Sequence, residues 1–200
     1  MTPLVLSSLM RLCNRLLKPL MILITAIFIS GCSSYRYESQ VELNQPLITA
    51  SGSTLDGTEV TIPNDFEGQP AILLFGYVHK SQFDIDRWLI GLDMTKDSRP
   101  DTVAIYELPA IKNPFAGWFS NRIDDAMREG IPREIWSDVI TIYDDGDKVQ
   151  RYTGNISPKN SRVLLVNSKG EVSYFYDRGF SVAALNELNK KVLSLNDEQR

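Results

Sequence analysis

The chain has 200 residues, of which 43% are hydrophobic and 23% are charged, and its net charge is −4 with its single histidine neutral. These fractions are those of a globular protein and exclude the disordered and fibrous classes. The length allows one ordinary domain with additional segments, and the acidic balance argues against nucleic-acid binding, which needs basic patches.

Residues 1–31 differ from the rest of the chain. They contain three basic residues and no acidic one, and an apolar run follows at 20–29. That run is too short for a membrane span, which needs about 20 residues. A basic region, a short apolar region and small residues before a cleavage site together predict a secretory signal peptide.

The predicted signal peptide, residues 1–31, ends at Gly31 within the tetrad Ile29-Ser30-Gly31-Cys32. This tetrad resembles the bacterial lipobox, in which a signal peptidase cleaves before the cysteine and its thiol becomes acylated. The resemblance implies that Cys32 carries diacylglycerol and palmitate. By resemblance to Gram-negative lipoproteins, Ser33 favours the outer membrane, with the protein facing the periplasm. An uncleaved anchor helix and an ordinary signal peptide are the alternatives.

The cysteines follow from this interpretation. The chain has two, Cys13 and Cys32. Cys13 would leave with the signal peptide and Cys32 would carry lipid, so the mature chain would hold no free thiol and no disulfide. Cleavage would also leave 18 basic residues against 25 acidic ones, a net charge of −7. We therefore expect membrane attachment through the acyl chains alone, and no nucleic-acid partner.

Residues 32–48 form the lipidated cysteine and a polar tether, and the folded domain is expected at 49–195, with a frayed tail at 196–200. The domain begins with a predicted hairpin at 52–62, because Asp56-Gly57 is a turn dipeptide and Val60 and Ile62 alternate with polar residues. The apolar run 71–75 predicts a strand that is buried on both faces.

A helix is predicted after the loop at 78–82. Ser81 is the expected N-cap, and Asp84 and Asp86 fall in the first turn, where negative charge suits the helix dipole. An apolar face follows at i, i+3, i+4 and i+7, formed by Ile85, Trp88, Leu89 and Leu92.

The remaining pattern alternates strands and helices. Strands are predicted at 101–106, 139–143, 162–167 and 171–176; helices at 120–130 and from 181 onward; and a short helix or loop at 147–153. The short turn at 168–170 predicts antiparallel pairing of the last two strands. This order predicts an α/β three-layer sandwich with a mixed central sheet and an N-terminal β-hairpin.

The same order resembles the thioredoxin-like superfamily over residues 50–195. The residues that carry the resemblance are Leu55-Asp56-Gly57, Glu67-Gly68-Gln69-Pro70, the late hairpin at 163–172 and Gly179. In dithiol members of that superfamily, a CxxC motif opens the helix after the core strand, and here those two positions fall at Lys80 and Phe83. The position of the cis-proline falls at Ser161.

Thiol redox chemistry needs a thiolate nucleophile, and the predicted mature chain offers none. The sequence therefore predicts a redox-inactive domain that is not an enzyme, with no catalytic residue and no cofactor.

A closer resemblance is to the cysteine-free branch that includes the mitochondrial ATP-synthase assembly factor. It rests on Tyr106-Glu107-Leu108-Pro109, Met127-Arg128, Gly130-Ile131 and the strand near Thr141. This resemblance implies a chaperone or docking role toward a protein partner.

Two groups of residues are candidate binding sites. His79, Lys80 and Ser81 precede the helix, where outward-pointing N–H groups could hold an anion or a small ligand. A partly exposed loop without a ligand is the simpler interpretation. A single imidazole with nearby carboxylates offers too few ligands for a typical zinc site. The aromatic residues Phe115, Trp118 and Phe119 are candidate partner-binding residues, because aromatic side chains are enriched at interfaces. Covering one face of the sheet is their alternative role.

Overall fold

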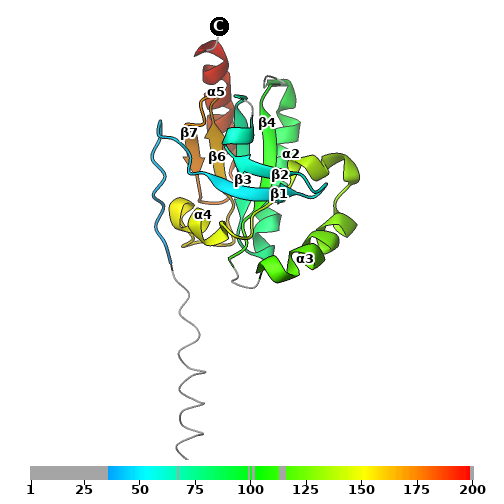
Figure 1. Ribbon diagram of the computed structural model, residues 1–200. Coiled ribbons are helices and arrows are strands. Elements are labelled where there is room, and N and C mark those ends of the chain that lie inside the picture. The colour runs from blue at the N-terminus through cyan, green and yellow to red at the C-terminus, as the bar shows by residue number, and fades with distance from the viewer. Residues whose placement is uncertain (1–35, 67, 99, 101, 113–115, 199–200) are drawn as a thin grey trace, which may run out of the picture. The chain divides into compact units, whose positions relative to one another are not determined.

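The computed structural model describes residues 36–198 except 67, 99, 101 and 113–115, and the side chains of 98, 116–119 and 196–198 are also outside the description (Figure 1). The predicted signal peptide, Cys32 and Phe115 lie outside the described residues, as do the side chains of Trp118 and Phe119.

The predicted N-terminal hairpin is confirmed. Strands β1 (Ala50–Thr54) and β2 (Glu59–Ile62) pair antiparallel. In the turn between them, the Asp56 carboxyl accepts a hydrogen bond from the Thr58 N–H at 3.1 Å, and Gly57 has φ +97°. Glycine adopts that left-handed conformation without steric cost, which explains the Asp-Gly turn.

A four-stranded mixed sheet forms the centre of the domain. Its strands run in the order β4 (Ala104–Pro109), β3 (Ala71–Gly76), β6 (Arg162–Val166) and β7 (Val172–Tyr176). β3 is parallel to β4 and antiparallel to β6, and β6 is antiparallel to β7. Every residue of β3 and of β6 is buried, which confirms that the apolar run at 71–75 is a two-sided core strand.

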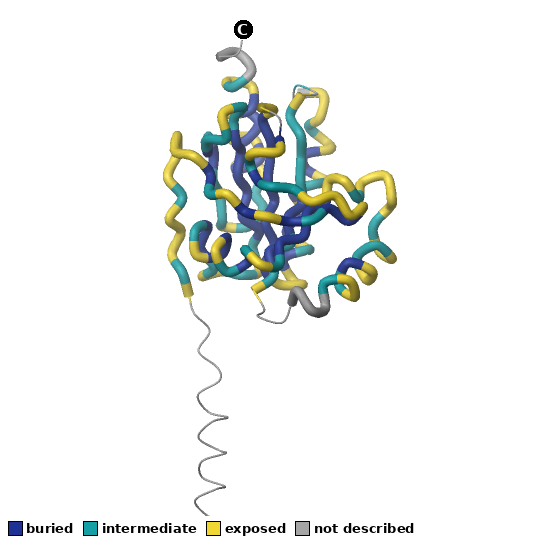
Figure 2. Tube along the Cα trace, viewed as in Figure 1, coloured by how far each residue is buried: buried dark blue, intermediate teal, exposed yellow. Residues whose placement is uncertain are grey.

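Successive residues of β3 point to opposite faces of the sheet and divide the core in two. Ile72 and Leu74 pack on one face with residues of α2 (Gln82–Met94) and α5 (Val182–Glu198). Leu73 and Phe75 pack on the other face with the β1–β2 hairpin and with α4 (Gly146–Thr153). The three layers of the expected α/β sandwich are visible in Figure 1, and Figure 2 shows the buried strands between them.

Some boundaries differ from the prediction. β4 begins at Ala104 rather than 101, because its parallel pairing with β3 starts at the pair Ala71↔Ala104. Helix α3 (Ala116–Gly130) begins four residues earlier than expected, and α4 is a helix where the sequence allowed a loop. The predicted strand at 139–143 is only β5 (Ile140–Thr141).

β5 is short because it bridges two sheets. It pairs antiparallel with β1 through Ser53↔Thr141, and single parallel bridges at Glu107↔Val139 and Ala110↔Ile142 connect the same stretch to the β4 edge. The small sheet β2-β1-β5 therefore continues from the edge of the central sheet.

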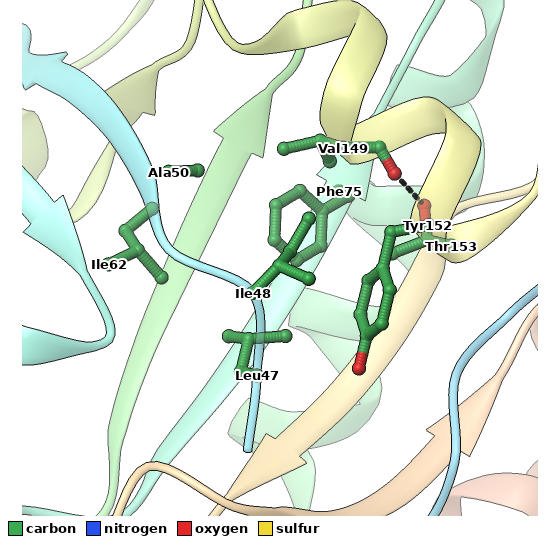
Figure 3. Close-up of a pocket in the computed structure, with 8 residues that line it drawn as sticks. All are labelled: Leu47, Ile48, Ala50, Ile62, Phe75, Val149, Tyr152 and Thr153. Carbon is green, nitrogen blue, oxygen red and sulfur yellow. Dashed lines mark hydrogen bonds between the residues drawn. The ribbon is translucent and has the colours of Figure 1, made fainter. Parts of the chain in front are cut away.

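Part of the stretch that the sequence assigns to the tether is attached to the domain. The N–H of Gln40 donates to the Tyr152 carbonyl at 2.8 Å, and the N–H of Leu47 donates to the Gly170 carbonyl at 2.9 Å. Leu47 is 6% exposed and lies with Ile48 beside Phe75 (Figure 3). The sequence does not predict these apolar contacts, because residues 33–48 are mostly polar and show no helical period.

The contribution of this segment to stability can be measured by truncating its buried leucine. We expect Leu47→Ala to lower the free energy of unfolding by about 2–4 kcal/mol, because it leaves a cavity in the core. Leu43→Ala is the matched control; Leu43 is 52% exposed, and its truncation is expected to change stability by less than about 0.5 kcal/mol. Equal, small effects of both substitutions in urea unfolding would show that the segment does not belong to the folded domain.

Candidate functional site

The loop after β3 is the place where thioredoxin-like enzymes carry their reactive thiols. Here a short 3-10 turn (His79–Ser81) leads directly into α2. His79 and Lys80 are exposed, and so is Phe83 in the first turn of α2, with 63% of its surface accessible. The two predicted CxxC positions, Lys80 and Phe83, are therefore accessible positions that hold no thiol.

The predicted capping role of Ser81 is wrong. Its hydroxyl donates backward to the Val78 carbonyl at 2.6 Å and makes no hydrogen bond to the first turn of α2. The cause is the 3-10 entry, which puts Ser81 itself in the helical region at φ −70° and ψ −18° rather than in the extended conformation of an N-cap. Ser81 is 2% exposed, so a ligand arriving from solvent would meet His79 and Lys80 first. An anion or small-ligand site at these residues stays a prediction.

Asp84 is the central polar residue at this end of the domain. One of its carboxyl oxygens accepts hydrogen bonds from the Ser161 N–H at 2.9 Å and from the Ser161 hydroxyl at 2.7 Å. The other accepts from the Phe180 N–H at 2.7 Å. Asp84 is 6% exposed. The first turn of α2 is thus tied to the loop before β6 and to the loop before α5, and the helix-dipole role that the sequence suggested for Asp84 is secondary to these bonds.

Arg162 is a buried cation beside this group. It is 1% exposed, its guanidinium donates to the carbonyls of Ser157 and Asn160 at 2.8 and 2.6 Å, and it lies 4.8 Å from the ring centroid of Tyr77. These contacts hold the loop before β6 in place. Carbonyl oxygens and an aromatic face together offset part of the cost of burying the charge.

Glu107 is a buried carboxyl group on β4, 8% exposed. Burial raises its pKa to about 7; a hydrogen bond from Gln82 opposes that shift, and the negative charge of Asp86 adds to it. A carboxyl group with this pKa changes its charge in the physiological range. Its neighbours Gln82 and Asp86 belong to the first turns of α2, so the group lies beside the exposed loop.

The contribution of Asp84 can be tested against Asp86, its exposed neighbour on the same helix. Asp84→Ala leaves the buried N–H of Ser161 without its acceptor, so we expect the free energy of unfolding to fall by about 2–4 kcal/mol. Asp86→Ala is expected to change it by less than about 0.5 kcal/mol. Chemical denaturation of both variants checks this, and comparable losses would contradict the role of Asp84.

The raised pKa of Glu107 predicts that the stability of the protein depends on pH. The pKa of this acid is higher in the folded than in the unfolded state, so between about pH 4.5 and 7 the folded chain binds more protons and its stability falls as the pH rises. Glu107→Gln keeps the neutral shape. We expect it to stabilise the protein at pH 8 by about 1–3 kcal/mol and by little at pH 4, where Glu107 is already protonated. Thermal melts across this range measure the effect, and a variant that follows the wild-type curve at every pH would refute it.

A polar groove opens on another part of the domain, between β1, β5 and α3. Its volume is about 310 Å³, and ten residues line it: Ser51, Gly52, Ser53, Glu59, Ser120, Asn121, Asp124, Thr141, Tyr143 and Asp144. Three of these residues are acidic and none is basic. The groove therefore suits a positively charged or hydroxyl-rich ligand.

Hydrogen bonds hold the floor of this groove in place. The Tyr143 hydroxyl donates to the Asp124 carboxyl at 2.6 Å, and the Thr141 hydroxyl donates to the Ser53 carbonyl at 3.0 Å. Burial first, and then Asp124, raise the pKa of Tyr143, so it remains a neutral donor. At Gly52 a β-carbon would lie 2.7 Å from a methyl carbon of Ile140 and 2.9 Å from the Thr141 carbonyl oxygen, so only glycine allows β1 and β5 to approach this closely.

Sequence reasoning missed the groove entirely. Its residues come from a hairpin strand, from α3 and from the stretch after β5, and each looks like an ordinary surface serine, threonine or acid. Only the pairing of β1 with β5, over a separation of 88 residues, brings them together. The predicted partner residues Trp118 and Phe119 precede the groove residue Ser120 in α3.

A second hollow in the described domain is much smaller than this groove. The cavity drawn in Figure 3 is apolar and holds about 10 Å³, which is room for a water molecule at most. Within the described ranges, no cluster of three or more histidine, cysteine, aspartate or glutamate side chains could hold a metal ion. Asp147, at the start of the stretch 147–153 where the sequence predicts a short helix or loop, is paired with Lys112 and Arg151 at 2.6 Å each.

Known proteins share this fold at low sequence identity. A thiol peroxidase from Chromobacterium violaceum is 12% identical with a TM-score of 0.52, over 84% of this chain and 96% of that one. A candidate thiol:disulfide interchange protein, DsbE, from Chlorobium tepidum is 14% identical with a TM-score of 0.51, over 78% and 98%. BsSco, a member of the Sco family of cytochrome c oxidase assembly proteins, is 11% identical with a TM-score of 0.51, over 78% and 95%. No family model matches the chain, and neither does any curated protein.

The fold of this chain is thioredoxin-like, as the sequence predicted. The prediction that the chain is not an enzyme is contradicted by the same neighbours, because a thiol peroxidase and a candidate thiol:disulfide interchange protein are built on this fold. That prediction followed mainly from the missing thiols, and the fold gives no ground for excluding catalysis here.

Between Arg36 and Glu198, no helix that the structure describes is long and apolar enough to cross a membrane.

Proposed function

We propose that the chain is an envelope lipoprotein whose thioredoxin-like domain binds a basic segment of a partner protein and assists its assembly. The groove between β1, β5 and α3 carries this proposal. It is the larger of the two hollows described above, and its lining combines three carboxylates with five hydroxyl groups and no cation.

The chemistry of the groove selects the ligand. Lysine and arginine side chains would replace water at Glu59 and Asp144, and the hydroxyl groups of Ser51 and Ser53 offer further hydrogen bonds along the open part of β1. N-terminal to Ser53, β1 does not pair with β5, since the ladder between them holds only the pairs Ser53↔Thr141 and Thr54↔Ile140. The N–H of Ser51 on this edge already donates to the Asp145 carboxyl at 2.9 Å, so the partner segment would bind through its basic side chains in the groove.

Two further observations support the lipoprotein and assembly parts of the proposal. The tetrad Ile29-Ser30-Gly31-Cys32 after a basic and apolar leader supports acylation of Cys32 and an outer-membrane location facing the periplasm. The resemblance to the cysteine-free branch with the ATP-synthase assembly factor supports an assembly role. BsSco, which shares the fold, is a member of the Sco family of cytochrome c oxidase assembly proteins.

Photo-crosslinking in intact cells tests the groove. A photo-reactive amino acid at Asn121, which lines the groove, is expected to give an adduct with one protein. The same residue at Arg122, its exposed neighbour on α3, is not expected to do so. Adducts of equal yield at both positions would contradict a groove-specific partner.

Charge variants add a second criterion. Neutralising two carboxylates with Glu59→Gln and Asp144→Asn is expected to reduce the yield at Asn121 several-fold, because the partner segment is basic. Asp125→Asn, on the same helix but outside the groove lining, is the control and is expected to leave the yield unchanged. An adduct that survives the double neutralisation would refute the proposed charge complementarity.

A further inference from the structure

The chain enters the folded domain at a fixed point. The N–H of Tyr37 donates to the Asn155 side chain at 2.8 Å, and the N–H of Asn155 donates back to the Tyr37 carbonyl at 2.9 Å. Two cations lie close to the Tyr37 ring, with Lys112 Nζ 4.8 Å and Arg151 Cζ 4.5 Å from its centroid. Both cations are held by the same acid, Asp147. Tyr37 is therefore firmly attached.

This entry point lies at the same end of the domain as the exposed loop of His79. Lys112, which donates to the Tyr37 hydroxyl at 3.0 Å, follows β4, and the N–H of Ala110 donates to the Gly76 carbonyl at the end of β3. From Tyr37 the segment runs alongside the domain to Leu47, which is bonded at Gly170, in the hairpin at the opposite end of β6 (Figure 1).

The length of the chain between Cys32 and Tyr37 limits how far this end of the domain can lie from a lipid on Cys32. Cys32 precedes Tyr37 by five residues. An extended chain spans at most about 3.6 Å per residue, so a lipid on Cys32 lies within about 18 Å of Tyr37. An acylated Cys32 would keep the His79 end of the domain beside the bilayer, whereas a free tether of 16 residues would let the domain turn in any direction.

The composition of this end fits a lipid surface. Large hydrophobic side chains are exposed in the loops that Asp84 and Arg162 tie together, or in the first turn of the helix that follows: Val78 (42%), Phe83 (63%), Ile156 (43%) and Val182 (64%). The basic residues Lys80, Lys159 and Arg178 are exposed in the same loops, against one exposed acid, Asp86, near the start of α2. Apolar side chains next to cations are typical of surfaces that lie at the headgroup level of a membrane. The local charge thus differs from the net charge of the mature chain, which had suggested attachment by acyl chains alone.

We propose that the end of the domain formed by the loops before α2, β6 and α5 rests on the lipid surface, held there by the attached segment 37–47. This inference rests on the acylation of Cys32 in the proposed function, but not on the partner-binding groove. It makes Val78, Phe83, Ile156 and Val182 lipid contacts, and it leaves the hairpin at 167–171 pointing away from the membrane.

The mature lipoprotein offers a direct test, because its only native cysteine is Cys32. Single cysteines introduced by Ile156→Cys or, as a control, by Lys169→Cys can each carry an environment-sensitive fluorophore. The proteins are reconstituted in vesicles of phosphatidylethanolamine with a minor fraction of phosphatidylglycerol, and quenching by brominated acyl chains is measured. We expect quenching at position 156 to exceed that at 169 several-fold.

Two further variants sharpen the outcome. Tyr37→Ala with Asn155→Ala removes the contacts at the entry point while Gln40 and Leu47 stay bonded, and is expected to reduce the difference between the two positions. Phe83→Ser with Lys80→Glu is expected to weaken quenching at 156. Equal quenching at both positions, or stronger quenching at 169, would overturn the proposal. The mass of the N-terminal peptide shows separately whether Cys32 is acylated, so a failure of the lipoprotein proposal is distinguishable from a failure of this orientation.

Discussion

The domain depends on a single buried carboxyl group for the shape of its exposed end. Asp84 receives hydrogen bonds from Ser161 and Phe180, which lie 77 and 96 residues further along the chain. Each of these donors belongs to a loop that precedes a core element, β6 or α5. A buried N–H without an acceptor is costly. The loops before α2, β6 and α5 therefore keep their mutual arrangement only as long as all of these hydrogen bonds are formed.

That arrangement occupies the position at which dithiol members of the fold carry reactive cysteines. Lys80 and Phe83 are exposed there, and the buried polar residues Asp84 and Arg162 below them are committed to holding loops in place. The end is thus a rigid surface whose outer side chains are free to contact a lipid layer. The acidic groove between β1, β5 and α3 is a separate feature, built on the extra hairpin that the fold adds at the edge of its central sheet.

The sequence predicted what depends on local pattern. The apolar run at 71–75, the turn at Asp56-Gly57 and the periodic faces of α2 and α5 each encode their own structure, and together they indicated the thioredoxin-like order. What could not be predicted depends on distant partners. In the sequence, Asp84 looks like an acid that stabilises a helix N-terminus, but in the structure it accepts hydrogen bonds from distant loops. Leu47 looks like a linker residue, but it is buried. The groove exists only because β1 meets β5, and no local pattern records that pairing.

Amide hydrogen exchange tests the account most directly. If Asp84 holds the end of the domain as a rigid unit, the amides of Ser161 and Phe180 open only with the core. Their protection should then match that of a central β6 amide such as Leu164, and should be lost selectively in Asp84→Asn. Exchange of Ser161 and Phe180 at the rate of exposed loop amides in the wild-type protein would contradict the account.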